Sequence, residues 1–364
     1  MKRWLSFLFG IWISVAAFCA EKSSNGLLAK GTKWETTFYQ RDSGQPGPVV
    51  VLTGGIHGNE PAGTAAAEQI RHWPITRGML IVIPRANVPG LRDGTRFLPG
   101  EPPQLRDLNR QFPKTKNATD ARGILATALW EFVGEQKPDW VIDLHEGFDF
   151  NQLNSKSVGS TIIDAKGKAA AIVVPLMLQA VNAEITDPKK KLIRLRYPVD
   201  GSLARAAHER LAATAMILET TSKSQPLSLR ARQHRLMVHA LLKHLQMTAD
   251  SPHVLVPTKT ESLCVAIYDA GGVGGNGPRN LDRVLRGMKH VLVQRVGAED
   301  IRGGTLSRFD LAIFPGGSGS KQASALESNG RAAVQQFVKR GGGYLGICAG
   351  SYLAAANYEW SLGI

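Results

Sequence analysis

The fold is decided first by the stretch Val49-Val50-Val51-Leu52-Thr53-Gly54-Gly55-Ile56-His57-Gly58-Asn59-Glu60. Its opening apolar run, rich in valine, is typical of a buried strand. The glycines that follow permit a tight turn from this strand into a helix, and the turn places His57 and Glu60 around one point. A phosphate loop is the competing interpretation of the glycines, but the Lys-Ser/Thr pair that a P-loop needs is missing.

Apolar runs alternate with helical patterns outward from this stretch, up to about residue 248. The pattern predicts strands over 48–53, 78–83, 139–144 and 214–219. It predicts helices near 61–72, 121–136, 165–183 and 228–247. We therefore expect an α/β domain over 30–248 with a mostly parallel sheet covered by helices. The segment 85–120 is rich in Pro, Gly and Arg, and such a long irregular segment inside a domain is usually functional.

A second α/β domain is expected over 261–364, after a linker at 249–260. Its pattern predicts a strand, a glycine-rich loop, a helix, two strands, a helix and a strand, in that order. The expected ranges are 262–268, 271–277, 278–286, 290–296, 309–314, 324–340 and 343–347.

Four side chains suited to metal or acid–base chemistry follow predicted strands: His57, Glu60, His145 and Glu219. Ligands of open α/β sheets gather beyond the carboxyl ends of the strands, so we expect all four at one sheet edge. Two imidazoles and one carboxylate leave a fourth zinc position open, which is the ligand set of catalytic zinc. We therefore predict one zinc ion per chain, with Glu219 as the base. Taken singly, each residue is equally typical of an ordinary polar loop or strand end.

Further candidates lie in the irregular segment and beside His145. Arg96, Asn109 and Arg110 offer donors for a substrate carboxylate and for oxyanion charge. Asp143 is suited to orient a ligand histidine. Arginines in the loops of a basic protein are mostly solvated, and Asp143 alone would also fit an ordinary strand position.

The ordered motifs GGxHGNE, DLNRxFP, DLHE and LET over residues 45–245 resemble the zinc carboxypeptidase family, above all its succinylglutamate desuccinylase/aspartoacylase-like branch. The resemblance implies a mixed sheet with helices on both faces. It also implies that His57, Glu60 and His145 bind zinc and that Glu219 is the general base. The implied reaction is hydrolysis of an amide bond beside a free carboxylate.

The same resemblance assigns substrate contacts within the irregular segment. Asn109 and Arg110 would hold the free carboxylate of the substrate. Arg96 would polarise the scissile carbonyl, with Arg92 and Arg106 as alternatives, because the spacing from Arg96 to Asn109 is longer than the family pattern suggests.

Cys348 lies between glycines in Gly346-Ile347-Cys348-Ala349-Gly350, after an apolar strand pattern. This arrangement is typical of a nucleophile elbow. Together with the PGGSG stretch at 315–319, it resembles the class I glutamine amidotransferase fold, especially the domain at the N-terminus of some biotin–protein ligases. A thiol nucleophile needs a base, normally a downstream histidine, and the last histidine of this sequence is His290. We therefore expect a truncated or non-catalytic domain, with Cys348 kept as a possible nucleophile.

The N-terminus and the composition bear on location and partners. Residues 1–20 have the basic start and short apolar stretch of a secretory signal peptide, so we expect an exported, periplasmic or extracellular protein. No other stretch is long enough for a membrane span. The formal net charge is +14, but no nucleic-acid motif accompanies it, and nucleic acid is not an expected partner.

These observations favour an exported zinc-dependent hydrolase acting on a small peptide, including a cell-wall peptide, or on an N-acyl amino acid. Two alternatives stay open. The first is a thiol-dependent amidotransferase or glutaminase that uses Cys348, and the second is a non-catalytic binding protein of the cell envelope.

Overall fold

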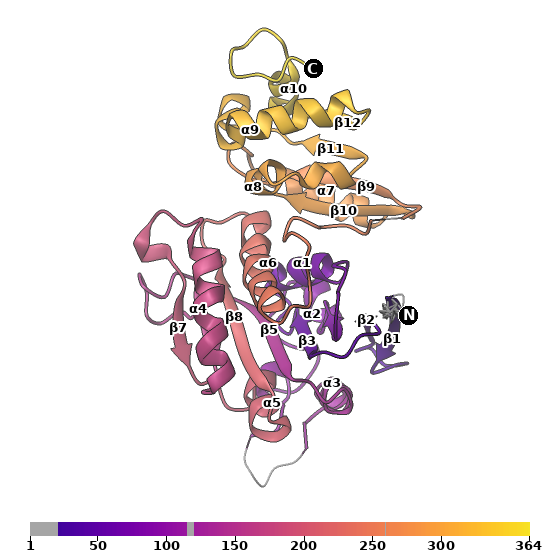
Figure 1. The fold of residues 1–364 in the computed structure, drawn as a ribbon, viewed down its shortest axis with the longest axis vertical. Helices are drawn as coiled ribbons and strands as arrows, with labels where there is room; N and C mark the ends of the chain where they lie inside the picture. The colour runs from indigo at the N-terminus through magenta and orange to yellow at the C-terminus, as the bar shows by residue number, and fades with distance from the viewer. Residues whose placement is uncertain (1–20, 115–119, 259) are drawn as a thin grey trace, which may run out of the picture.

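The computed structural model describes residues 21–114, 120–258 and 260–364, and two separate sheets organise it (Figure 1). The expected signal peptide at 1–20 lies outside the described residues. An eight-stranded sheet with its helices forms the N-terminal unit, residues 21–247. A four-stranded sheet with its helices forms the C-terminal unit, residues 263–364. The expected mixed sheet followed by a second α/β unit is therefore confirmed.

The large sheet has the order β1-β2-β4-β3-β5-β8-β6-β7. Its strands are β1 (Lys22–Leu28), β2 (Thr36–Asp42), β3 (Val49–Gly54), β4 (Met79–Ile83), β5 (Trp140–Gly147), β6 (Thr161–Asp164), β7 (Ile193–Arg196) and β8 (Thr214–Thr221). The central strands β4, β3, β5 and β8 are parallel, as expected. Antiparallel pairs join β1 to β2, β2 to β4 and β6 to β8, and the edge pair β6–β7 is parallel, so the sheet is mixed.

Helices cover both faces of the large sheet. They are α1 (Pro61–Ile70), α2 (Val88–Asp93), α3 (Ile124–Glu135), α4 (Lys168–Asn182), α5 (Leu203–Leu211) and α6 (Leu227–His244), with short 3-10 turns η1 (Leu108–Arg110) and η2 (Pro188–Lys190). Side chains of a strand alternate between faces. Val50 and Leu52 accordingly pack with α1, α4 and α6, whereas Val51 packs with α3 and α5.

The small sheet has the order β10-β9-β11-β12, and all its pairs are parallel. Its elements are β9 (Leu263–Tyr268), α7 (Gly277–Arg286), β10 (Val291–Val296), α8 (Ala298–Arg302), η3 (Thr305–Arg308), β11 (Leu311–Phe314), α9 (Gly319–Lys339), β12 (Gly343–Gly346) and α10 (Ala349–Ala354). Helices α8, α9 and α10 pack on one face, and α7 packs on the other.

Several expected boundaries differ from the structure. The strand β1 starts at Lys22, before the expected domain start at residue 30, and its pairing with β2 makes it part of the large sheet. The sequence pattern missed β1 because it is an exposed, polar edge strand. The segment 85–120 contains α2 and η1. The expected linker 249–260 is not free, because Val254, Leu255 and Val256 are buried.

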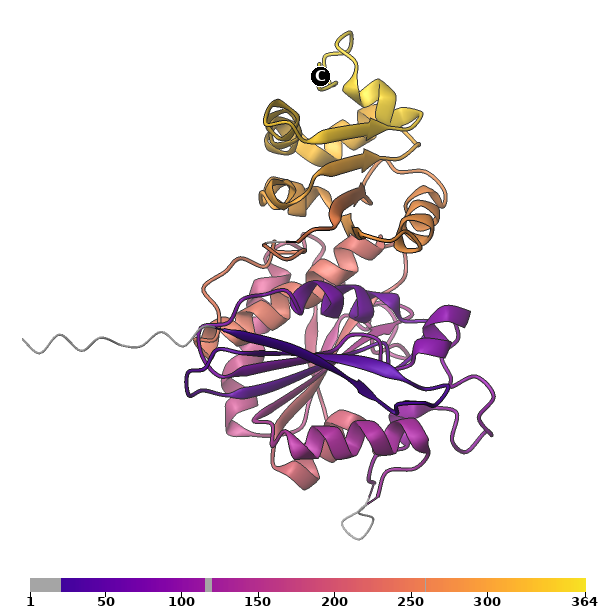
Figure 2. The same ribbon diagram turned by 90° about the vertical axis from the view of Figure 1, so that its right-hand side faces the viewer.

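The two units are joined by direct polar contacts. The Ser228 amide and hydroxyl at the start of α6 both donate to Asp269 after β9. The Gln69 side-chain amide donates to Gln294 Oε1 of β10 at 3.0 Å. Figure 2 shows the C-terminal unit lying against α1 and α6. No helix among residues 21–114, 120–258 and 260–364 is both long and apolar enough to span a bilayer.

Candidate metal centre

The turn after β3 brings His57 and Glu60 to the carboxyl edge of the large sheet. The Glu60 amide donates to the His57 carbonyl at 3.2 Å, which closes the turn. Close approach of a neighbouring chain segment requires Gly58 here, since a Cβ at this position would lie 2.0 Å from the Gly90 backbone. The third residue, His145, lies near the end of the adjacent parallel strand β5.

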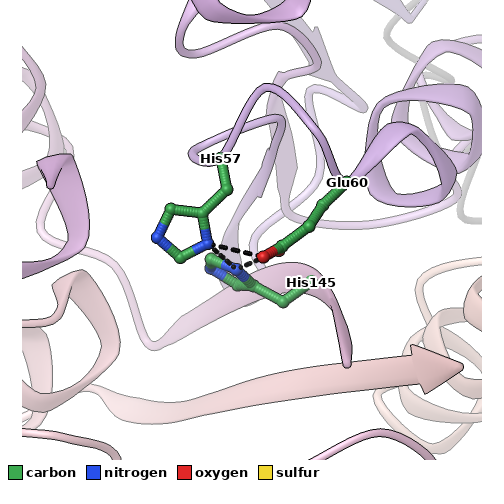
Figure 3. Close-up of side chains that lie close together, drawn as sticks. All are labelled: His57, Glu60 and His145. Carbon is green, nitrogen blue, oxygen red and sulfur yellow. Dashed lines mark hydrogen bonds and ion pairs between the residues drawn. The ribbon is translucent and has the colours of Figure 1, made fainter. Parts of the chain in front are cut away.

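The three side chains point at one another (Figure 3). The His145 Nδ1 atom lies 3.1 Å from His57 Nδ1 and 2.8 Å from Glu60 Oε2, and His57 Nδ1 lies 2.8 Å from Glu60 Oε1. All three residues are buried. Ligand atoms at zinc–nitrogen distances of about 2.0–2.1 Å in a tetrahedron are about 3.3 Å apart. The observed separations are close to this value, so the three side chains fit a metal ion.

The outer ring nitrogens of both histidines face carboxylates. The His145 Nε2 atom lies 2.8 Å from Asp143 Oδ2, as the sequence suggested. The His57 Nε2 atom lies 3.2 Å from Asp107 Oδ1. Such carboxylate–histidine pairs orient metal ligands and leave the opposite ring nitrogen free to coordinate. Asp107 was missed from the sequence, although its place directly before Leu108-Asn109-Arg110 was a usable signal.

Glu219 on β8 stands beside His145 in the register of the parallel pair β5–β8. The side chain is buried, and its Oε2 atom has no hydrogen-bond partner among the described residues. Burial raises the pKa of Glu219, and although the charges of His145 and Arg96 oppose this, the nearby carboxylates Glu60 and Asp143 add to the rise. A buried carboxyl oxygen without a partner, beside the candidate ligands, is placed to exchange a proton with a bound reactant.

The same clustering of charged groups shifts the pKa values of the candidate ligands. Burial alone would raise the pKa of Glu60, but the charges of His57 and His145 outweigh it, and the pKa is well below its ordinary value. Burial would lower the pKa of His145, but Asp143 and Glu60 outweigh it and leave that pKa well above its ordinary value. The carboxylates around the two imidazoles thus stabilise positive charge at this position.

Of the three candidate arginines, Arg96 is the one that reaches the cluster. Its Nη1 atom donates to Glu60 Oε1 at 3.0 Å, and its Nη2 atom lies 3.5 Å from Asp107 Oδ2. Arg92 instead pairs with Asp93, and Arg106 stacks over the Phe97 ring with 4.3 Å between the guanidinium carbon and the ring centroid.

Asn109 and Arg110 lie in η1, at the edge of the candidate centre. The Asn109 Nδ2 atom lies 3.3 Å from His145 Nε2, and its Oδ1 atom accepts from the Leu203 amide at 3.1 Å. The half-buried Arg110 donates from Nη1 to the Asn109 carbonyl at 2.8 Å. Apart from the alternatives Arg92 and Arg106, the structure therefore brings the sequence-predicted residues of the N-terminal unit to one edge of its sheet.

A further residue of the site, Glu146, went unnoticed in the sequence. Glu146 follows His145 directly, and its Oε2 atom accepts from the Ala62 amide at 2.7 Å at the start of α1. Its Oε1 atom accepts from Arg230 of α6. Glu146 thus ties the ligand strand to two helices, and its position in the motif Asp143-Leu144-His145-Glu146 was the available signal.

Cys348 lies apart from this centre, in the C-terminal unit. It occupies the turn between β12 and α10 with φ of +50°, and its side chain is exposed. A Cβ on Gly350 would lie 2.0 Å from the Phe314 carbonyl oxygen, which explains the small neighbour. No hydrogen bond reaches Cys348 Sγ from the described residues. The strand-to-helix turn is present as expected, but no base contacts the thiol in the part of the chain that the structure describes.

Comparison with known proteins assigns the chain to a family. Residues 46–245 match the model of the succinylglutamate desuccinylase/aspartoacylase catalytic domain, and the chain belongs to this family. Residues 267–364 match the model described as biotin-protein ligase, N terminal. Both resemblances inferred from the motifs are confirmed.

Individual relatives are distant. An uncharacterized protein of Chlamydia muridarum (strain MoPn / Nigg) is 38% identical over 50 residues, which is 14% of this chain and 19% of that protein. The match therefore spans about a fifth of the length of this curated relative.

Similar solved structures include three bacterial proteins. Apo cell shape determinant protein Csd4 from Helicobacter pylori is 18% identical over 64% of this chain and 66% of that chain, with a TM-score of 0.48. Succinylglutamate desuccinylase/aspartoacylase from Rhodobacter sphaeroides is 18% identical over 64% and 68%, with a TM-score of 0.45. The ectoine utilization protein EutE (DoeB) from Ruegeria pomeroyi is 19% identical over 63% and 69%, with a TM-score of 0.45. Because these sequence identities and TM-scores are low, the assignment of the chain to a family rests on the match to the family model.

Proposed function

We propose that this protein is a zinc-dependent hydrolase that cleaves an amide bond next to a free carboxylate, in a peptide or an N-acyl amino acid. The observation that carries the proposal is the convergence of His57, Glu60 and His145 beside the buried carboxyl of Glu219, whose Oε2 atom has no hydrogen-bond partner among the described residues. Membership in the succinylglutamate desuccinylase/aspartoacylase catalytic domain family supports it.

His57, Glu60 and His145 would hold the zinc ion through two Nδ1 atoms and one carboxylate. Zinc bound there would supply Lewis-acid chemistry, which makes water acidic enough to lose a proton near neutral pH. Asp143 and Asp107 hold the two imidazoles in the orientation that this ligand set needs.

Glu219 would act as the general base and then as the general acid. Its carboxylate takes a proton from the attacking water as the water oxygen bonds to the scissile carbonyl carbon. The same proton then passes to the amide nitrogen, so that the carbon–nitrogen bond breaks and a carboxylic acid and a free amine result. The raised pKa of Glu219 suits this double role, because a catalytic acid–base is most effective with a pKa near the working pH.

Arg96, Asn109 and Arg110 would bind and polarise the substrate. Arg96 lies close enough to Glu60 for its guanidinium to stabilise negative charge that develops on the carbonyl oxygen. Asn109 and Arg110 would take the free carboxylate of the substrate, since an arginine fork matches the two oxygens of a carboxylate.

The proposal extends to location. The expected signal peptide at 1–20 implies that the protein works outside the cytoplasm, where cell-wall peptides are among the available substrates. N-terminal sequencing of the protein recovered from cell fractions tests this part. Retention of residues 1–20 in a cytoplasmic fraction would contradict it.

The function is tested by metal analysis of the purified protein, coupled to hydrolysis of a panel of peptides and N-acyl amino acids. We expect one zinc ion per chain, cleavage beside a free carboxylate, loss of cleavage with a chelator and recovery on adding zinc. A protein that binds no metal and cleaves nothing in the panel would refute the proposal.

A further inference from the structure

A cavity of about 620 Å³ lies where the N-terminal and C-terminal units meet, next to the candidate metal centre. The N-terminal unit contributes Gly58 and Asn59, which stand between the ligands His57 and Glu60 in the sequence. The C-terminal unit contributes one face of α7 and Arg295 of β10. Figure 2 shows α7 facing the α1 and α2 end of the N-terminal unit. We call this space the junction cavity.

The lining of the junction cavity is rich in arginine. The N-terminal unit supplies Arg85, Arg92 and Arg230, and the C-terminal unit supplies Arg279, Arg283, Arg286 and Arg295. Two carboxylates, Glu68 and Asp282, lie among the lining residues. Three more carboxylates outside the lining pair with its arginines: Asp93 with Arg92, Glu146 with Arg230 and Asp269 with Arg295. Like charges gathered in a partly enclosed space repel one another and attract anionic ligands. The excess of arginine therefore indicates an anionic ligand.

Helix α7 presents its charges as a regular row. Arg279, Asp282, Arg283 and Arg286 recur at helical spacing and so share one face. Asp282 accepts from Arg286 Nε at 2.9 Å, which neutralises that end of the row. Arg279 and Arg283 are exposed, and no carboxylate of the described chain lies within ion-pair distance of either. Arg283 donates from Nη2 to Asn280 Oδ1 at 3.1 Å, a neutral partner, so the charges of both guanidinium groups remain available for an anionic ligand.

The walls of the junction cavity are held in a fixed relation to each other and to the metal centre. Asp300 of α8 is buried and binds Arg232 and Arg235 of α6, which locks the two units together. Arg230 of α6 bridges from the cavity to Glu146, the neighbour of ligand His145. A ligand in the cavity therefore lies beside the loop that carries two candidate metal ligands.

We propose that the junction cavity binds an acidic segment of the substrate, so that the C-terminal unit selects peptides that carry several carboxylates. This inference rests on the proposed function, because it concerns the part of the substrate that extends away from the scissile amide. In this arrangement the C-terminal unit serves the metal centre and needs no chemistry of its own.

The spacing of the arginines favours an acidic peptide over a single compact anion. Arg279 and Arg283 are about 6 Å apart along the helix axis, at about 1.5 Å per residue. Side chains on the same side of an extended peptide are about 6.6–6.8 Å apart, since each residue adds about 3.3–3.4 Å. Carboxylates on alternate residues of a peptide thus match the arginine row, with one guanidinium fork for each carboxylate.

The test measures binding and cleavage by the full-length protein. The binding probe is a short fluorescein-labelled peptide of alternating glutamate and alanine residues, compared by anisotropy with its glutamine counterpart, with and without chelator. The cleavage test uses two substrates that differ only by glutamate or glutamine away from the scissile bond. The test variant is Arg279→Gln/Arg283→Gln, and the matched control is Lys321→Gln/Lys339→Gln, which removes two exposed charges from α9.

We expect the wild type and the control to bind the glutamate peptide more tightly than the glutamine peptide. In the test variant, the ratio of the affinities for the glutamate and glutamine peptides should fall about tenfold, equivalent to about 1.4 kcal/mol. Its cleavage of the glutamine substrate should stay unchanged. The preference should weaken as ionic strength rises. Equal affinity of the wild type for both peptides, or a preference that survives in the test variant, would overturn the inference.

The outcomes separate this inference from the proposed function. If neither substrate is cleaved but the glutamate peptide binds through Arg279 and Arg283, the proposed function fails and the acidic-ligand site stands. If both substrates are cleaved equally and neither peptide is preferred, the hydrolase stands and the role given to the junction cavity is wrong.

Discussion

Replacing Asp300 by asparagine should weaken the junction between the two units. The loss in the free energy of unfolding should be larger than the loss from removing an exposed charge. The Asp300 carboxylate is fully buried and accepts from Arg232 Nη1 at 2.9 Å and from Arg235 Nη2. Asparagine keeps the shape and one acceptor oxygen, so the substitution removes the charge and leaves the volume intact. Breaking a buried ion pair in this way costs about 3–5 kcal/mol, because the partner charge stays buried.

The structure places the expected cost at the lower end of this range. Arg232 keeps Glu184, whose Oε2 atom accepts from its Nε at 2.8 Å. Arg235 keeps only neutral acceptors, Gln69 and the Pro252 carbonyl, and it is fully buried. One uncompensated guanidinium thus predicts a loss of about 3 kcal/mol for Asp300→Asn.

Urea unfolding followed by far-UV circular dichroism measures this loss at neutral pH. The control is Glu327→Gln, which breaks an exposed pair with Arg302 and should cost about 1 kcal/mol or less. An Asp300→Asn protein that unfolds at the same urea concentration as the wild type would refute the reasoning. It would mean that the buried ion cluster adds nothing to the junction.

The pH dependence of the same contact gives a second readout. Burial raises the pKa of Asp300, but Arg235, His253 and Arg232 outweigh it and leave the pKa well below its ordinary value. A carboxyl with a lowered folded pKa stabilises the fold above its unfolded pKa of about 3.9 and loses this contribution as the pH falls further. The difference in stability between wild type and Asp300→Asn should therefore be full at neutral pH and shrink below about pH 4.

Three further substitutions test the metal centre and the C-terminal unit. Glu219→Gln should keep the bound metal but reduce kcat by about 10²–10⁴-fold, as expected for loss of a general base, and an unchanged rate would move the base elsewhere. His57→Ala should leave the circular dichroism spectrum intact and abolish stoichiometric metal in elemental analysis; retained metal would contradict the ligand assignment. Cys348→Ser should leave chelator-sensitive hydrolysis unchanged, and a large loss would favour the thiol-dependent alternative.

Much of the candidate metal centre could be predicted from short sequence motifs. His57 and Glu60 share one turn, and His145 and Glu219 end strands of apolar residues, so local pattern places each at a strand end. Parallel strands then bring their carboxyl ends to one edge, which makes the assembly predictable. The sequence favoured Arg96 but left Arg92 and Arg106 open as alternatives, because loop geometry over 85–110 depends on contacts that no periodicity encodes.

The sequence by itself determined the two α/β units, the central parallel strands and the candidate ligand set. Apolar periodicity and strand-end motifs are local, so they can be read without knowing how distant segments meet. Only the tertiary structure revealed the edge strand β1, the carboxylate of Asp107 behind His57 and the arginine-lined junction cavity. These features join residues far apart in the chain, such as Arg230 and Arg283, and polar surface residues carry no periodic signal that would pair them.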